Sequence, residues 1–303
     1  KYTRENLKNK TSIPDLHNII LRLQSENDNL QKRVNKLKSR KKTTTETTID
    51  TMVYVNRILA LEYELDEMKQ YKEDYKQAVI QNKETVVDIA DANFKMYLLR
   101  YHDVDMDGKI TLWDMKHIYI IDISRKSVSG FLNREIHNLK GIELCVNLQK
   151  LVCSNNTLTG DLDLSANKYL KKLCVDHCQL DKIDISNNSD LSYLDCSYNK
   201  ITTLNLSQNP KLEYVDCQYN KISNLDLSNN KELRYLYASC NDLVTLNLSV
   251  NEKLNEVKCN QNKLEIVTCP PTTISLMDVR INPLQTLNGL DRIEKLQVDQ
   301  KFK

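Results

Sequence analysis

The sequence predicts an α+β fold: a β-solenoid of about seven turns, preceded by a helical module with a single EF-hand-like loop and by an N-terminal coiled coil. Three observations predict it. Leucines recur every 21 residues through the C-terminal half. Before them, one short segment carries aspartates at alternating positions. At the N-terminus, apolar residues recur at heptad spacing.

The leucine period predicts the solenoid. Each unit is too small to bury its own apolar face, so neighbouring units must stack and share one core. Less regular units extend the array from Leu148 to about residue 287, and we therefore predict a leucine-rich-repeat solenoid that occupies residues 125–303 with its caps. The leucines that open the regular units are Leu170, Leu191, Leu212, Leu233 and Leu254.

Each unit predicts two short strands. The opening leucine and the positions three and five residues later alternate inward along a first strand. Leu204 and Leu206, 13 and 15 residues after their opening leucine, indicate a second strand. A recurrent asparagine at the bend after the first strand is expected to bond unpaired backbone groups. These asparagines are Asn156, Asn199, Asn220, Asn241, Asn262 and Asn282, and a second bend carries Asn167, Asn188, Asn209, Asn230 and Asn251.

Nine cysteines suggest a disulfide framework at first sight, but four of them fall at the inward position of the first strand. A parallel ladder of this kind gives poor geometry for bridging, so we expect free, buried thiols. These four are Cys153, Cys196, Cys217 and Cys259. His177 is expected to be a turn residue, and the remaining cysteines lack the CxxC spacing of a zinc site.

Residues 103–114 carry the strongest chemical signal and lie in a predicted helical region, 51–124. Calcium prefers six to eight oxygen ligands, and this loop offers them at EF-hand spacing. Gly108 allows the sharp turn, and Ile110 points into the core between helices near Ala92–Tyr101 and Leu112–Ile118. The alternative is an acidic turn without a cation. The predicted Ca²⁺ ligands are Asp103, Asp105, Asp107, the Lys109 carbonyl, Thr111 and Asp114.

Residues 1–50 predict a stalk and linker. Leucines repeat at one heptad position, and β-branched residues with one Asn27 repeat at the other, which favours a parallel two-stranded coiled coil and hence a homodimer. The alternative is an antiparallel hairpin formed with a similar apolar seam between Met52 and Val79. Residues 41–48 lack apolar side chains and are expected to form a flexible linker.

The exposed positions of the first strands predict a ligand surface on the concave face of the solenoid. Tyrosine combines a large apolar ring with a polar tip and is enriched at recognition surfaces. The alternative is that the rings only stabilise the sheet through cross-strand contacts. The candidate ligand-binding residues are Tyr193, Asp195, Tyr214, Asp216, Tyr235 and Tyr237.

The order of these parts, with the segment FKMYLLRYHDVDMDGKIT followed by LKGIELCVNLQKLVCSNNTL and the LDLSxN units, resembles cell-surface leucine-rich-repeat proteins of Bacteroides-type bacteria. The cysteine-bearing repeat also resembles internalin-type repeats. The resemblance implies an exported protein at the cell surface, either lipid-anchored or secreted. It also implies a function in adhesion. It implies no catalytic residues.

Composition narrows the function classes. The net charge of +2 argues against a nucleic-acid partner, and no apolar stretch is long enough to span a bilayer. The chain starts without methionine, which leaves room for a removed export signal. Because no nucleophile, base and orienting group converge in spacing, we expect no enzyme. The expected function is a protein-binding module or adhesin for a host matrix or surface protein; the alternatives are glycan binding and an architectural spacer.

Overall fold

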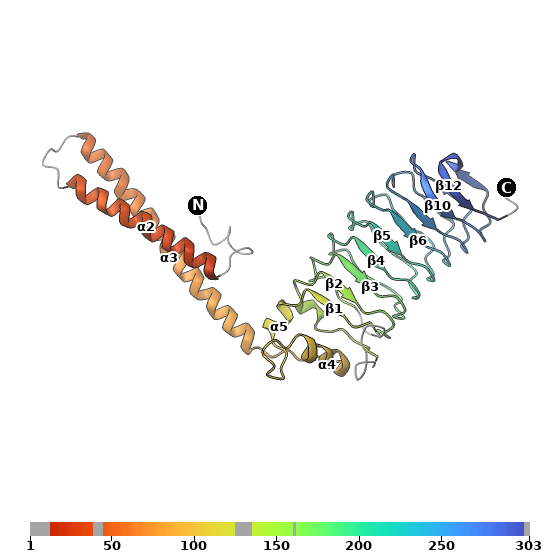
Figure 1. The fold of residues 1–303 in the computed structure, drawn as a ribbon, viewed down its shortest axis with the longest axis horizontal. Helices are drawn as coiled ribbons and strands as arrows, with labels where there is room; N and C mark the ends of the chain where they lie inside the picture. The colour runs from red at the N-terminus through yellow and green to blue at the C-terminus, as the bar shows by residue number, and fades with distance from the viewer. Residues whose placement is uncertain (1–12, 39–44, 125–134, 160–161, 300–303) are drawn as a thin grey trace. The chain divides into compact units, whose positions relative to one another are not determined.

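The computed structural model describes residues 13–38, 45–124, 135–159 and 162–299 (Figure 1). The chain forms two compact units, Lys1–Glu84 and Thr85–Lys303. None of the described helices is long and apolar enough to cross a membrane.

The first unit is a hairpin of two helices, α2 (Ile13–Lys38) and α3 (Thr45–Glu84), which lie side by side in Figure 1. An ion pair joins the Arg57 guanidinium to the Glu26 carboxylate at 2.9 Å. This is the hairpin alternative of the sequence analysis, and the homodimer stays a prediction. Thr45–Thr48, predicted as linker, begin α3, and the rest of that linker lies outside the described residues. The buried seam contains Ile20, Leu23, Leu61, Leu65 and Met68.

The second unit begins with the loop module, in which α4 (Ala92–Tyr101) and α5 (Leu112–Lys116) flank the acidic loop. Asp91 caps α4, because its Oδ1 accepts hydrogen bonds from the backbone N–H groups of Asn93 and Phe94 at 2.9 Å. Its Oδ2 accepts two more from backbone N–H groups at residues 137 and 138. Phe94 and Met115 belong to the same apolar core as the repeats, so this module caps the solenoid.

The solenoid carries a parallel sheet of nine described strands, stacked in chain order along its length in Figure 1. Seven of them lie in the predicted turns, and β1 and β12 add a strand at either end that the leucine period did not reveal. The strands are β1 (Ile120–Asp122), β2 (Lys150–Val152), β3 (Lys172–Cys174), β4 (Tyr193–Asp195), β5 (Tyr214–Asp216), β6 (Tyr235–Tyr237), β8 (Glu256–Lys258), β10 (Ile274–Asp278) and β12 (Ile293–Gln297).

Within the part of the chain that the structure describes, the predicted second strand is present only in the last turns. β7 (Thr245–Asn247), β9 (Ile266–Thr268) and β11 (Thr286–Asn288) form a three-stranded parallel sheet. In an earlier turn, Leu204 and Leu206 point into the core as expected, with 6% and 1% of their surface exposed, but lie outside any described strand. Their alternation follows from burial alone, since it does not require hydrogen bonds between neighbouring turns.

The bend asparagines bond the backbone as predicted. The Asn199 side-chain amide donates to the carbonyls of Val175 and Cys196 at 2.8 and 3.0 Å, and its Oδ1 accepts from the N–H groups of Cys178 and Leu180. At the second bend, Asn188 donates to the carbonyls of residues 164 and 167. Both rows of asparagines therefore serve the scaffold.

All nine cysteines are free thiols. Those at the inward strand position, Cys153, Cys196, Cys217 and Cys259, are fully buried, which confirms the prediction of free, buried thiols.

Candidate functional site

The six predicted ligand-binding residues lie together on one face of β4, β5 and β6. The strand register places Tyr193 beside Tyr214, and Tyr214 beside Tyr235. It also places Asp195 beside Asp216, which neighbours Tyr237. The residue between each pair points into the core, so the tyrosines and aspartates share the outer face. We call Tyr193, Asp195, Tyr214, Asp216, Tyr235 and Tyr237 the tyrosine surface.

The tyrosine rings of this surface contact one another in defined geometries. Tyr193 and Tyr214 stack with centroids 4.2 Å apart and an angle of 2° between their planes. The Tyr214 ring meets the Tyr235 ring at 6.2 Å and 45°, and meets the Tyr237 ring edge-on at 5.5 Å. Burial raises the pKa of Tyr193 and Tyr214, so both hydroxyls stay protonated at neutral pH.

Lysines close the tyrosine surface at both ends. The Lys172 Nζ lies 3.7 Å from the centroid of the Tyr193 ring, and the Lys258 Nζ lies 4.5 Å from that of Tyr237. Both contacts are within the range of cation–π interactions. The rings on this face therefore already accept cationic groups from the chain itself.

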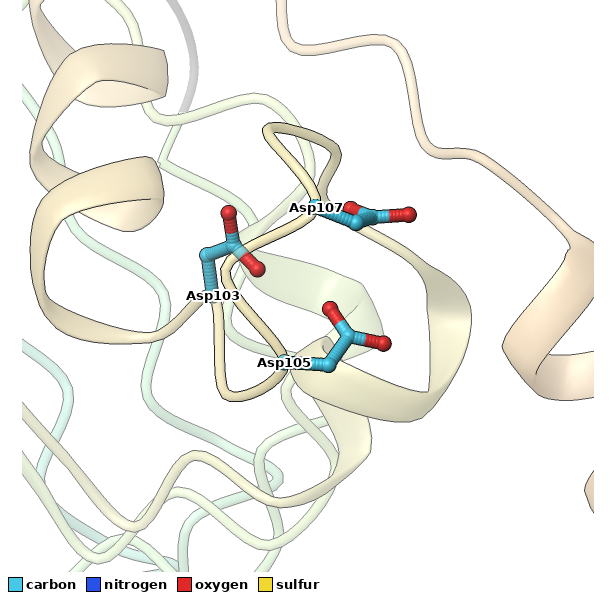
Figure 2. Close-up of side chains that lie close together, drawn as sticks. All are labelled: Asp103, Asp105 and Asp107. Carbon is cyan, nitrogen blue, oxygen red and sulfur yellow. The ribbon is translucent and has the colours of Figure 1, made fainter.

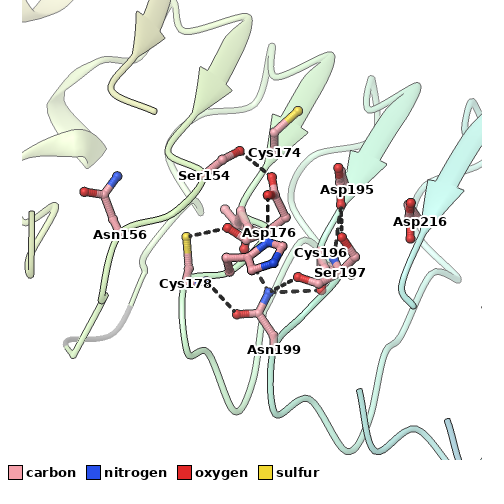
Figure 3. A network of polar contacts seen from close by, with 12 residues as sticks. Ser154, Asn156, Cys174, Asp176, Cys178, Asp195, Cys196, Ser197, Asn199 and Asp216 are labelled. Carbon is pink, nitrogen blue, oxygen red and sulfur yellow. Dashed lines mark hydrogen bonds and ion pairs between the residues drawn. The ribbon is translucent and has the colours of Figure 1, made fainter. Parts of the chain in front are cut away.

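The two carboxylates are held by local hydrogen bonds. Asp195 Oδ1 accepts from the Ser197 hydroxyl at 2.8 Å, a bond drawn in Figure 3, and from the Ser197 N–H at 3.1 Å. Asp216 Oδ1 accepts from the backbone and side-chain N–H groups of Gln218. Burial raises the pKa of Asp216 to about 6 and also raises that of Asp195.

A second aromatic row lies at the bend just beyond these strands. His177 and Tyr198 stack at 4.1 Å between centroids, and Tyr198 and Tyr219 stack at 4.2 Å. All three residues have left-handed backbone, with φ of 53°, 53° and 52°. His177 is thus a turn residue as expected, but its stacking was missed. The signal available in the sequence was the aromatic residue directly before two of the bend asparagines.

The acidic loop gathers three of its predicted ligands, which Figure 2 shows close together on one loop. Asp103, Asp105 and Asp107 each place a carboxylate oxygen within 4.8 Å of the others. The Gly108 N–H donates to Asp103 Oδ2 at 2.9 Å, and Gly108 has a φ of 78° that favours glycine. Asp103 Oδ1 is buried without a hydrogen-bond partner, which makes it an available ligand.

The other predicted ligands are arranged differently. Asp114 and Thr111 form a capping box at the start of α5, with 2.6 Å between the Thr111 hydroxyl and Asp114 Oδ2. Lys109 places its Nζ 3.8 Å from Asp107 Oδ2. The sequence also gave no sign that the Val87 N–H donates to the Ile110 carbonyl at 2.8 Å, which ties the loop to the segment just before α4.

One hollow among the described residues lies elsewhere. It has a volume of about 760 Å³ and is lined largely by polar side chains such as Thr157, Asp163, Lys182 and Asp184. None of its lining residues belongs to the tyrosine surface or to the acidic loop. The tyrosine surface and the acidic loop therefore both lie outside this hollow.

No family model matches this sequence, and no curated protein matches it. Solved structures do. The internalin inlF of Listeria monocytogenes matches with a TM-score of 0.50 and 16% identity, over 65% of this chain and 75% of that one. The functional domain of InlJ from the same species, described as including a cysteine ladder, matches with a TM-score of 0.40 and 24% identity, over 69% of this chain and 59% of that one. The likeness to inlF shows the leucine-rich-repeat fold.

Proposed function

We propose that this chain is a non-enzymatic protein-binding module whose partner lies across the tyrosine surface. The observation that carries the proposal is the set of four tyrosines projecting from three adjacent strands around two carboxylates. Tyrosine-rich faces bury a large apolar area at low entropic cost and keep a polar tip for hydrogen bonding. We further propose that the module acts as an adhesin at the cell surface, with a host matrix or surface protein as its partner.

The ring geometry favours a protein over a glycan. A sugar ring that stacks on an aromatic side chain needs one open ring face. Tyr193 has the Lys172 ammonium over its ring and the Tyr214 ring stacked in parallel at 4.2 Å. Ring edges and hydroxyls are what this face offers, and a protein partner can use both. The spacer alternative predicts that the rings only stabilise neighbouring strands, at roughly 0.2–1 kcal/mol for each pair.

An array of extracellular matrix proteins and glycans tests the proposal. The chain is compared with the variant Tyr193→Ala/Tyr214→Ala/Tyr235→Ala and with a control, Tyr63→Ala/Tyr119→Ala/Tyr169→Ala, which removes three tyrosines exposed elsewhere. We expect a protein signal that the first variant loses and the control keeps. A glycan signal with the same pattern would favour the glycan alternative, and silence on both arrays would favour the spacer.

We also propose that the acidic loop binds calcium and stiffens the entrance of the solenoid. The three gathered carboxylates and the unpartnered Asp103 oxygen support this. Asp114 would join them only by leaving its capping box with Thr111. Since the loop module shares the core of the repeats, a ligand that binds the folded loop stabilises the whole unit.

Calorimetric titration with Ca²⁺ and with Mg²⁺ measures whether the loop binds either ion, and thermal unfolding measures the resulting change in stability. At a free concentration 100 times the dissociation constant, the ion should stabilise the second unit by about 2.7 kcal/mol. The variant Asp105→Asn should lose this stabilisation, whereas Asp88→Asn, which changes a carboxylate whose side chain is 98% exposed before α4, should retain it. Equal thermal unfolding in calcium and in chelator would contradict the proposal.

A further inference from the structure

Several charged side chains of the solenoid form ion pairs. Between neighbouring turns, Arg234 pairs with Glu213, Lys253 with Glu232 and Lys263 with Asp242. On the outer face of the nine-stranded sheet, Lys258 pairs with Glu256 and Arg280 with Asp278, at 2.6 and 2.7 Å. Asp195 and Asp216 differ from Glu256 and Asp278, the paired carboxylates on this face. Among the described residues, no cationic group lies within ion-pair distance of either carboxylate.

This arrangement is unfavourable in the free protein. Asp216 is only 9% exposed, and Asp195 occupies the same register position on the adjacent strand, about 4.8 Å away across the sheet. Two like charges at this spacing in a partly desolvated position repel each other, and each lacks a compensating cation. A cationic group from outside would relieve both effects at once, so the missing charge points to the partner.

The surrounding rings define which cation fits. Lys172 and Lys258 show that the Tyr193 and Tyr237 rings accept a positive charge over their faces. A guanidinium is planar, bonds carboxylates through two parallel N–H groups and packs against aromatic rings, whereas an ammonium is a compact, strongly hydrated charge. Because the two lysines lie at the ends of the tyrosine surface, they repel basic residues there and favour one at the centre.

We propose that the partner inserts an arginine side chain between the tyrosines at Asp195 and Asp216, from a segment whose flanking residues are acidic or neutral. The inference rests on the proposed function, since it names the chemistry of the partner at the same surface. It also specifies the contact: the guanidinium bonds both carboxylates, and its aliphatic stem packs against the edges of the Tyr214 and Tyr237 rings.

Fluorescent 12-residue peptides test this contact with the full chain. One peptide carries a central arginine flanked by glutamates. Its relatives replace the arginine with lysine or with citrulline, the neutral analogue of the same shape, or exchange the charges so that a central glutamate is flanked by arginines. We expect the arginine peptide to bind best, and the citrulline and exchanged peptides to bind at least about tenfold more weakly.

The matched variants are Asp195→Asn/Asp216→Asn and Asp163→Asn/Asp184→Asn. Asp163 and Asp184 are exposed and accept from the N–H two residues on, as Asp195 does, so both variants remove two charges from similar local turns. Asn205 occupies the position equivalent to Asp184 in the next turn, and its Oδ1 accepts a hydrogen bond from the Ser207 N–H. Asparagine is therefore compatible with this kind of turn. The first variant should lose about tenfold or more in affinity for the arginine peptide, and the second should not change.

Two results would overturn the inference: equal binding of the arginine and citrulline peptides, including no binding of either at 1 mM, or full affinity in Asp195→Asn/Asp216→Asn. The outcomes separate it from the proposed function. A protein partner lost with the tyrosines but kept by the aspartate variant would leave the binding function and remove the arginine contact. If the arginine peptide binds in a way that depends on the carboxylates but no protein on the array binds, the arginine contact would stand and the proposed function would fall.

Discussion

At the scale of single residues, Asp216 links the tyrosine surface to pH. Burial raises its pKa to about 6, above the roughly 3.9 of an aspartate in an unfolded chain. Between these values the folded state binds more protons than the unfolded state, so the stability due to this group rises as pH falls from about 6 to about 4. The groups that act on it are Asp195 on the adjacent turn, Asp176 one turn further away, and Gln218, whose hydrogen bonds to Asp216 oppose the rise in pKa.

We therefore predict that Asp216→Asn stabilises the chain at pH 7 by about 1 kcal/mol, a value discounted for the partial exposure of the carboxylate. The gain should shrink to a small fraction of this value at pH 4, where Asp216 is protonated in the folded state and about half protonated in the unfolded state. Urea unfolding at pH 4, 5, 6 and 7 measures this. Asp184→Asn is the control, because hydrogen bonds from Ser186 lower the pKa of that exposed carboxylate and no gain is expected. Destabilisation by Asp216→Asn at pH 7 would refute the assignment.

A bend asparagine should matter far more than a surface residue. Asn199→Ala removes side-chain bonds to two carbonyls and two N–H groups within 3.1 Å and leaves them in a half-buried bend. Each orphaned buried group costs about 1–3 kcal/mol, and water can satisfy some of them, so we predict a loss of about 3–5 kcal/mol. Urea unfolding of this variant beside the exposed Asn187→Ala measures it, and a difference below 1 kcal/mol would contradict the structural role.

The departure at Cys178 shows how far the repeat could be followed from the sequence. Cys178 stands at the position where other turns have the bend asparagine, eight residues after the opening leucine. In the structure its Sγ lies 3.1 Å from the Cys153 carbonyl, so the thiol takes over part of the donor role of the amide. The thiol does not replace the hydrogen bonds that the asparagine Oδ1 accepts from backbone N–H groups. Nothing in the 21-residue period indicates which of the two sets of hydrogen bonds a substitute must keep.

At the scale of elements, prediction succeeded where burial and periodicity coincide. The first strands and α4 lie where the apolar pattern places them, because inward alternation and capping are local properties. The prediction of second strands was wrong in the earlier turns, because Leu204 and Leu206 can be buried without hydrogen bonds between neighbouring strands. The Val87 bond to Ile110 joins distant segments without a repeating signal, so only the folded chain reveals it.

The helical hairpin and the coiled-coil dimer predict different behaviour. Leu61→Asp places a charge in a seam position with 0% exposure and should lower the helical content of the first unit, whereas Leu59→Asp, at 59% exposure, should not. Circular dichroism of the full chain measures both. Because the chain divides into two compact units, we expect neither variant to change the unfolding of the repeats.

Sedimentation equilibrium tests whether two chains also associate. Asn27 Oδ1 is buried without a partner in the hairpin, and an asparagine from a second helix at this heptad position would supply one. A dimer that Asn27→Leu alters in size or strength would support the coiled coil of the sequence analysis. A monomer at all concentrations would leave the hairpin as the whole structure of this unit.

At the scale of the whole molecule, cysteine reactivity reports on one of the two units and not on the other. Every cysteine lies at or after Cys145, so thiol chemistry reports only on the solenoid. Eight of the nine are buried, and burial raises the pKa of Cys145 and Cys174 to about 12, which leaves almost no reactive thiolate. Cys240 is the partly exposed one.

We predict that an aromatic disulfide reagent modifies one thiol of the native chain quickly and the other eight together, at a rate set by opening of the solenoid. Cys240→Ser should remove the fast step alone. Since neighbouring turns share one core, a stabilising ion at the acidic loop should slow the eight-thiol step, whereas Leu61→Asp in the other unit should leave it unchanged. A second thiol that reacts as fast as Cys240 would mean that part of the repeat array opens independently, and its position would identify the turn where the shared core is weakest.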